Sequence, residues 1–407
     1  MLNATPQIER WFRLQWQQHT PPFYGSVDVR NAGYKIAPVD TNLFPGGFNN
    51  LSADMVPLAV MAAQAGIEKY CPDARNLLLI PENHTRNTFY LQNVYRLAQI
   101  LRQTGLVVRL GSLSPDITAP TELSTAAGQT LTIEPLVRIE KNGYARLGLA
   151  GFDPCAILLN NDLTSGIPDI LRGLNDQILL PPLHGGWAVR RKSNHFAAYN
   201  TVVSDFAAEL NIDPWLLNPY FDVCKAVNFN DGTGAQEMQD KVADVLAKIA
   251  TKYTEYKIKE EPFLIVKADA GTYGMGIMQV KSPDDVVGLN RKQRNKMSVI
   301  KEGHQVSEVL IQEGVPTIEQ VNGGNAEPVV YMIDRYVVGG FYRANAQRGR
   351  DENLNAPGMT FEPLPFSEPC NVQLEDCESN RFYSYGVVGR LALLAASREL
   401  ENTTHLV

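Results

Sequence analysis

The chain has 407 residues, of which 44% are apolar and 20% are charged, as in folded globular proteins of two or three domains. This composition excludes collagen-like, disordered and coiled-coil proteins. Because 37 basic and 44 acidic residues give a net charge of −7, no nucleic-acid partner is expected. The sequence has no apolar run of about 18 residues, which predicts no membrane span.

The N-terminal 20 residues are predicted to form an amphipathic helix, with Thr5 as its N-cap and Pro6 at its first position. They lack the apolar core of a signal peptide. The five cysteines are scattered, without a Cys-x-x-Cys pair, and the six histidines lack metal-ligand spacing. We therefore expect a cytoplasmic protein with reduced thiols and no structural zinc site.

Strand and helix patterns alternate in the first third of the chain. Leu77–Ile80 is a short apolar run, residues 86–104 show helical spacing with Gly105 at the C′ position, and Leu106–Leu110 is a second apolar run. Strand, helix and strand of these lengths predict a parallel α/β layer. Residues 112–132 are rich in Ser, Thr, Pro and Gly, which predicts a surface connection or a domain boundary.

The α/β pattern continues through the middle of the chain. Ala156–Leu159 and Gln177–Leu180 are candidate buried strands. Residues 234–257 and, near the C-terminus, residues 385–400 have the apolar spacing of amphipathic helices. No internal repeat or low-complexity segment is present.

The clearest chemical signal is Lys267, at the end of a predicted strand over Phe263–Lys267. A glycine-rich turn at residues 269–276 follows and leads into a second predicted strand, Ile277–Val280. In a P-loop the lysine follows the glycines, so this is a different arrangement. The backbone N–H groups of such a turn and the lysine ammonium can bind phosphate oxygens, and the alternative is a plain β-hairpin.

Three more strands are predicted at Val309–Gln312, Val329–Ile333 and Tyr336–Tyr342, and Ser282 is predicted to cap a helix. The first of these strands ends in Gln312-Glu313, a pair that can offer side-chain and backbone groups to an adenine edge. By itself this pair is equally a feature of ordinary strand ends.

Residues 260–365 hold these motifs in a definite order: Ile265–Lys267, Gly271, Gly274, Gly276, Gln312–Pro316, Arg343, Asn353–Leu354, Gly358 and Pro363–Leu364. In this order they resemble the ATP-grasp superfamily, and most closely the bacterial glutathione synthetases. Four further strings extend along the chain, Val27–Lys35, Ala37–Pro45, Gly47–Leu51 and Arg190–Phe196. With them the whole chain resembles a smaller family, the proteobacterial glutamate–cysteine ligases (γ-glutamylcysteine synthetases) with an ATP-grasp fold.

This resemblance implies an α/β, ATP-grasp-like (glutathione synthetase-like) protein with an N-terminal α/β domain. We expect that domain over residues 1–115 with a substrate loop at 27–51, a middle α/β region facing the substrates over 116–233, and a nucleotide-binding region over 234–407 with a glycine-rich lid at 269–276. The implied activity joins the γ-carboxylate of L-glutamate to the amine of L-cysteine through an acyl phosphate, with ATP and Mg²⁺, as the first step of glutathione biosynthesis. Homo-oligomerisation is left open.

The resemblance also implies roles for individual residues of the nucleotide site. The expected catalytic residues are Lys267, Arg343 and Asn353, since phosphoryl transfer depends on positioning and on neutralising charge. The expected nucleotide-binding residues are Lys267, Gly271, Gly274, Gly276, Gln312, Glu313, Val315 and Glu319. Glu319 is a candidate ribose contact, and a solvated acid in a loop is its alternative.

Two segments are candidates for binding the amino-acid substrates. Residues 28–50 are polar and show neither helical nor strand period. The family resemblance is the main support for a substrate role here: Arg30 and Lys35 could bind an α-carboxylate, Asp40 could bind an α-ammonium group, and Asn42, Asn49 and Asn50 could fix orientation. The alternative is an ordered loop whose asparagines bind their own backbone.

The second segment is the basic cluster Arg190-Arg191-Lys192 with His195, which could meet a phosphate or a substrate carboxylate. A solvated face is the alternative. The basic run 291–296 is predicted to be the exposed side of a helix or a lid.

The magnesium ligands are not evident from the sequence. ATP-grasp enzymes normally carry an aspartate and a Glu-x-Asn near the end of their core, where this chain reaches Val407. Either Asn353 and Asn355 contribute, or the acidic strand lies beyond the given sequence.

Two rival functions remain. One is another ATP-grasp ligase, such as a glutathione synthetase, against which the block 28–50 argues. The other is a nucleotide-binding protein without ligase activity.

Overall fold

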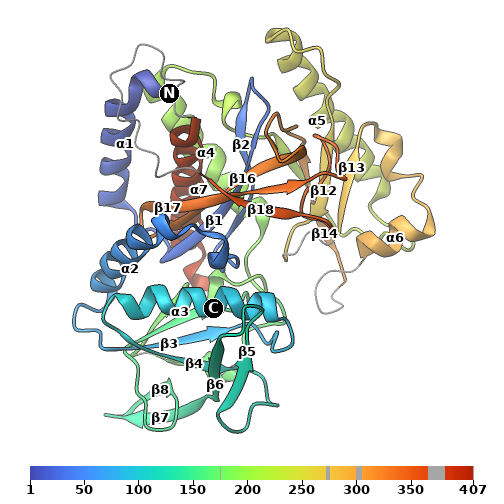
Figure 1. The fold of residues 1–407 in the computed structure, drawn as a ribbon. Coiled ribbons are helices and arrows are strands. Elements are labelled where there is room, and N and C mark those ends of the chain that lie inside the picture. Colours follow the sequence, from blue (N-terminus) through green and yellow to red (C-terminus); the bar gives the residue numbers. More distant parts are fainter. Residues whose placement is uncertain (175, 272–275, 299–304, 365–380, 407) are drawn as a thin grey trace.

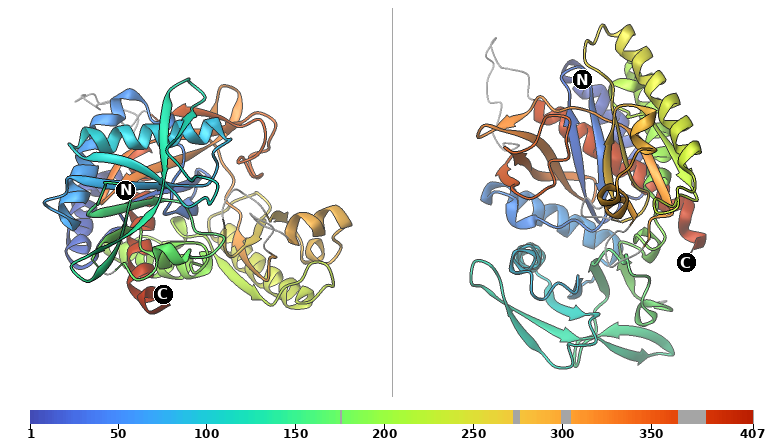
Figure 2. Two further views of the ribbon diagram at one scale, coloured as in Figure 1. Left: turned by 90° about the horizontal axis from the view of Figure 1, so that it is seen from below. Right: turned by 90° about the vertical axis from the view of Figure 1, so that its right-hand side faces the viewer.

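The computed structural model describes residues 1–174, 176–271, 276–298, 305–364 and 381–406. These residues form three larger sheets and one two-stranded ribbon, with helices packed around them (Figure 1, Figure 2). The α/β class predicted from the sequence is confirmed. None of the helices in the described residues has the length and apolar character needed to span a membrane.

The largest sheet joins strands from the two ends of the sequence. Its order is β18-β17-β16-β1-β2, with β15 beside β16, and every pair is antiparallel. The prediction of an irregular segment at residues 28–50 is therefore wrong, because this stretch contains β1 and β2. Strand β1 shows no alternation because it lies between two strands and is buried on both faces. The strands are β1 (Tyr24–Asn31), β2 (Ile36–Asn42), β15 (Gln320–Val321), β16 (Gly324–Ile333), β17 (Tyr336–Asn345) and β18 (Thr360–Pro363).

Alternate residues of β16 face two different sets of helices. Val330 and Met332 pack with residues of α1, α4 and α7, whereas Val329, Tyr331 and Ile333 pack with residues of α2 and α3. The predicted helices near both ends of the chain are confirmed, although the N-cap of α1 is Ala4 rather than Thr5. The helices are α1 (Thr5–Gln18), α2 (Val56–Tyr70), α3 (Thr88–Gln103), α4 (Lys192–Leu210) and α7 (Arg381–Thr403).

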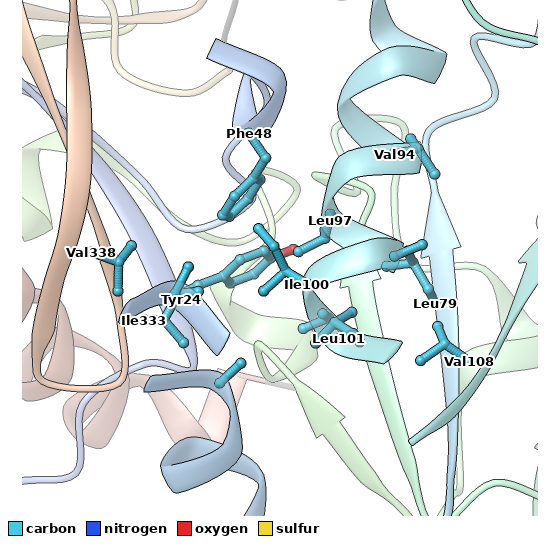
Figure 3. Packing of buried hydrophobic residues seen from close by; sticks show 14 of the residues in the cluster. Tyr24, Phe48, Leu79, Val94, Leu97, Ile100, Leu101, Val108, Ile333 and Val338 are labelled. Carbon is cyan, nitrogen blue, oxygen red and sulfur yellow. The ribbon is translucent and has the colours of Figure 1, made fainter. Parts of the chain in front are cut away.

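A second sheet, of order β10-β9-β3-β4-β6-β5, holds the predicted parallel layer. Helix α3 lies between it and the largest sheet, where Leu97 and Ile100 approach Tyr24 (Figure 3). The stretch 112–132, predicted as a surface connection, contains β5 and the start of β6 at the sheet edge. The strands are β3 (Asn76–Pro81), β4 (Val107–Ser112), β5 (Thr121–Ser124), β6 (Thr130–Pro135), β9 (Ala156–Asn160) and β10 (Ile178–Leu180), beside the ribbon of β7 (Val137–Lys141) and β8 (Tyr144–Gly148).

The third sheet is antiparallel, with the order β11-β14-β12-β13, and packs on α5. It provides the lysine strand, the glycine turn and the following strand in the order that the ATP-grasp resemblance implies. Ser282 caps only a short 3₁₀ helix over Pro283–Val286, and the basic run forms α6 on the surface. The elements are β11 (Phe221–Lys225), α5 (Ala235–Glu255), β12 (Leu264–Ala268), β13 (Ile277–Val280), α6 (Arg291–Ser298) and β14 (Glu308–Glu313).

Candidate active site

A pocket lies between the third sheet and the edge of the largest sheet. Its walls come from β1, β2, β12, β14 and β16, from the start of α4 and from the segment before β18. Ten of the residues predicted from the sequence line it: Arg30, Asp40, Lys192, Lys267, Gly271, Gln312, Glu313, Val315, Asn353 and Asn355. The fold thus gathers residues from both ends of the chain around one cavity.

Two lysines and one carboxylate meet on one wall of the pocket. The Lys192 Nζ lies 2.7 Å from Asp40 Oδ1, and the Lys267 Nζ donates to the Val39 carbonyl at 2.5 Å. Burial lowers the pKa of Lys267 to about 8, although Asp40 opposes this shift. Burial also disfavours the charged form of Asp40, but Lys192 and Lys267 outweigh it and hold the pKa of this carboxyl well below its usual range.

The same wall carries acidic residues that the sequence reasoning missed. Asp28 faces Asp40 across the β1–β2 pair, and Glu327 lies on β16. Arg343 Nη1 lies 2.7 Å from a carboxylate oxygen of each, and Arg30 Nε donates to Glu327 at 2.5 Å. The signal for Glu327 was a single charge within an apolar strand pattern, which indicates a paired or functional buried group.

Arg343 does not line the pocket, whereas Asp28 and Glu327, the two carboxylates that its guanidinium binds, do. Its predicted catalytic role would therefore be an electrostatic effect exerted through these two carboxylates, without direct contact with the pocket. Arg30 does reach the wall, but each of its three nitrogens already has an acceptor, in Glu327, Arg350 and Glu352.

Apolar side chains line another part of the pocket, among them Phe263, Ile265 and Val315. Gln312 is 2% exposed, and its Nε2 has no hydrogen-bond partner within the described residues. Such a donor can meet an acceptor on a bound ring. The Glu313 carboxylate is less available, because it accepts hydrogen bonds from Lys35, Trp215 and the Tyr220 backbone.

The first residue of the glycine turn, Asp269, is held in place by hydrogen bonds to α4. Asp269 binds the first residues of α4, since its carboxylate accepts from the Ser193 N–H at 2.7 Å and from Ser193 Oγ at 2.6 Å. Its carbonyl accepts from the Lys192 N–H at 2.7 Å. Gly271 and Gly276 adopt positive φ angles of 90° and 62°, which glycine tolerates. Gly274 lies outside the described residues.

Several residues expected to bind the amino acids lie elsewhere. Lys35 is buried away from the wall, with Nζ 2.8 Å from Glu313 Oε1. Asn42 accepts from the Phe44 N–H, and Asn49 donates to Asn50, so these three asparagines act within their own segment. Of these contacts, only that of Asn42 is made with the main chain, as the alternative interpretation expected.

Three further predicted residues have structural partners away from the pocket. Arg191 pairs with Glu308 at 3.1 Å, and His195 Nδ1 lies 3.1 Å from Glu399. Glu319 is buried rather than solvated, and its carboxylate accepts from Asn31, Tyr342 and Tyr385. It does not line the pocket, which leaves no geometric basis for a ribose contact.

Asn353 and Asn355, the predicted metal ligands, do line the pocket. Acidic side chains line the pocket as well, from β1 and β2 in Asp28 and Asp40 and from the segment before β18 in Asp351 and Glu352. In the part of the chain that the structure describes, no three His, Cys, Asp or Glu side chains form a metal-binding group.

The cysteines with described positions are unpaired and distant from this chemistry. Cys71, Cys155 and Cys224 form no disulfide, and none of them lines the pocket. Cys370 and Cys377 lie outside the described residues.

Comparisons with known proteins agree over nearly the whole chain. A family model described as glutamate-cysteine ligase matches residues 1–400. The crystal structure of a candidate gamma-glutamylcysteine synthetase from Methylobacillus flagellatus is 63% identical, with a TM-score of 0.89 over 99% of this chain and 95% of that one. A comparison with curated proteins gave no match.

Two other solved structures are much more distant. D-alanyl-alanine synthetase A from Vibrio cholerae is 11% identical, with a TM-score of 0.35 over 78% of this chain and 81% of that one. A RimK domain protein ATP-grasp from Sphaerobacter thermophilus is 11% identical, with a TM-score of 0.28 over 80% of this chain and 99% of that one.

Proposed function

The chain belongs to the glutamate–cysteine ligase family, so it is a ligase that joins glutamate to cysteine, and we propose that it does so with ATP in the pocket described above. One observation carries the proposal: Lys192, Lys267, Asp28 and Asp40 converge on a pocket that also has an apolar wall and the unpartnered Gln312 amide. Such a combination suits a nucleotide, whose base is apolar on its faces and whose phosphates are anionic.

The base of ATP is assigned to the apolar part of the pocket. Phe263, Ile265 and Val315 would contact its faces, and the Gln312 Nε2 would donate to a ring nitrogen. The phosphates are assigned to Lys267 and Lys192, with backbone N–H groups of the turn that begins at Asp269. This is the ATP-grasp arrangement that the sequence implied.

A divalent cation fits the acidic wall. Asp28 and Asp40 offer hard carboxylate oxygens from paired positions of β1 and β2. Mg²⁺ is usually held by one or two carboxylates together with substrate phosphates and water, so two protein ligands are sufficient. When bound, Mg²⁺ would neutralise phosphate charge during transfer. Asn353 and Asn355 stay candidates for an outer contact.

In the proposed reaction, a γ-carboxylate oxygen of glutamate attacks the γ-phosphorus of ATP. The bond to ADP breaks and an acyl phosphate forms. The cysteine amine then attacks the acyl carbon, phosphate leaves with the electrons of the C–O bond, and the amine loses a proton. Lys267 and Lys192 hold the transferred oxygens in place and offset their charge, which is the main requirement of phosphoryl transfer.

The amino-acid substrates are assigned to the polar part of the same pocket. Asn353 and Asn355 offer amide groups there, and the Arg30–Glu327 pair contributes its charges to the wall, although the Arg30 nitrogens already have protein acceptors. These groups have the chemistry to orient an α-amino acid beside the phosphates.

The test measures ADP and phosphate release from Mg-ATP with four mixtures: glutamate, cysteine, both, and γ-glutamylcysteine plus glycine. Release only with glutamate and cysteine, together with γ-glutamylcysteine detected by mass, is expected. Release with the last mixture would indicate a glutathione synthetase, and nucleotide binding without release in any mixture would indicate a non-catalytic protein. A folded Lys267→Ala variant that keeps full activity would remove this pocket from the reaction.

A further inference from the structure

We propose that Glu399, on the C-terminal helix α7, is a positioning residue for the strand that carries Asp40. It acts through Arg190, which fixes the main chain of β2 next to that aspartate. This inference rests on the proposed function of the pocket, because it explains how Asp40 is held among the phosphate-binding lysines.

The first observation is a buried ionic network that does not touch the pocket. Arg190 donates to both oxygens of Glu399, from Nε and Nη2 at 3.0 Å each, and His195 Nδ1 lies 3.1 Å from the same carboxylate. The side chains of Arg190 and Glu399 are 2% and 3% exposed. A buried ion pair contributes little net stability relative to an apolar replacement, so its value lies in what it positions.

The second observation is where the remaining donor of Arg190 points. Its Nη1 donates to the Thr41 carbonyl at 2.8 Å. Three consecutive residues of β2 are then each held by a different cation: Lys267 binds the Val39 carbonyl, Lys192 binds the Asp40 carboxylate, and Arg190 binds the Thr41 carbonyl.

These contacts matter because, among the residues that the structure describes, β2 is the last strand of its sheet and pairs with β1 alone. The outward carbonyls of an edge strand have no strand partner, so side chains or water must satisfy them, and here two cationic side chains do. Trp187 supports two of the three cations, since its ring centre lies 5.0 Å from the Arg190 guanidinium carbon and 4.3 Å from Lys192 Nζ. Glu399 neutralises and orients Arg190, so it determines whether the third contact is made.

The experiment compares Glu399→Gln with Glu9→Gln in the full chain. Glu9 pairs at 2.8 Å with Arg390, which is also on α7. This pair is far more exposed than that of Arg190 and Glu399, so the Glu9 variant controls for the docking of the helix. For Glu399→Gln we expect kcat to fall about 10–100-fold, the usual effect of removing an outer-shell partner, with a higher Mg²⁺ requirement. Glu9→Gln should leave both unchanged.

A second readout does not depend on activity. Hydrogen exchange of the amides in residues 36–42, measured without ATP, should accelerate in Glu399→Gln but not in Glu9→Gln. If Glu399→Gln does not fold, Arg190→Lys answers the same question, because one ammonium cannot reproduce the three contacts of the guanidinium.

A wild-type kcat in folded Glu399→Gln, or unchanged hydrogen exchange in β2, would overturn the proposal. A lower melting temperature with unchanged kcat and exchange would mean that Glu399 has a merely structural role. If the wild-type protein shows no release of ADP that depends on glutamate and cysteine, the proposed function fails. The exchange measurement would still decide whether Glu399 positions β2.

Discussion

The buried pair of Lys35 and Glu313 gives a direct test of the structure against the sequence-based interpretation. The sequence predicts that Lys35 binds a substrate carboxylate. In the structure its side chain is 1% exposed, and its ammonium lies 2.8 Å from a Glu313 oxygen and 4.2 Å from the centre of the Trp215 ring. The change to make is Lys35→Met, which keeps most of the length of the side chain and removes its charge.

The expected loss of stability follows from the hydrogen-bond donors that remain around Glu313. In the variant its carboxylate, also 1% exposed, keeps only the Trp215 indole N–H and the Tyr220 backbone N–H as donors. Breaking a buried ion pair by removing one partner costs about 3–5 kcal/mol, because the other charge stays buried without compensation. Adding Glu313→Gln removes that charge, so the double variant should recover about 2 kcal/mol, within the range of coupling between contacting residues.

The assay is urea unfolding of the wild type, both single variants and the double variant, with steady-state kinetics of the folded proteins. Since Glu313 lines the pocket beside Gln312, the KM for ATP should rise in Lys35→Met while the KM for glutamate stays unchanged. A variant with wild-type stability and a higher KM for glutamate alone would refute the structural argument and restore the substrate role.

Four further outcomes are expected. Because burial lowers the pKa of Lys267 to about 8 from its ordinary 10.5, kcat/KM for ATP should fall as the pH rises through about 8, and Lys267→Arg should remove that limb of the pH profile. Asp28→Asn and Asp40→Asn should each raise the Mg²⁺ concentration for half-maximal rate by about 10–100-fold; an unchanged requirement would exclude them as ligands. Glu319→Gln should lower the free energy of unfolding by about 1–3 kcal/mol without changing the KM for ATP, whereas a change in that KM would favour the ribose contact. Cys224→Ala should keep its turnover and lose about 1 kcal/mol of stability, and a large loss of kcat in the folded variant would contradict the mechanism.

The placement of the predicted site residues separates two kinds of sequence signal. Lys267, Gly271, Gln312 and Val315 lie on the pocket because a strand, a turn and a second strand position them locally. Lys35 and Glu319 were assigned from the family resemblance and their charge, without a local strand or turn to position them, and both are buried with partners from distant parts of the chain.

The sequence by itself determined most of the secondary structure, the parallel layer, the lysine and glycine turn, and the family. Apolar period and turn residues act over a few neighbours, so they are readable without the fold. The tertiary structure alone decided that β1 and β2 join β16, which brings Arg343 to Asp28 across 315 residues of sequence. Pairing over such separations depends on register and burial of whole strands, and a polar residue in a doubly buried strand reveals its partner only after the sheet is assembled.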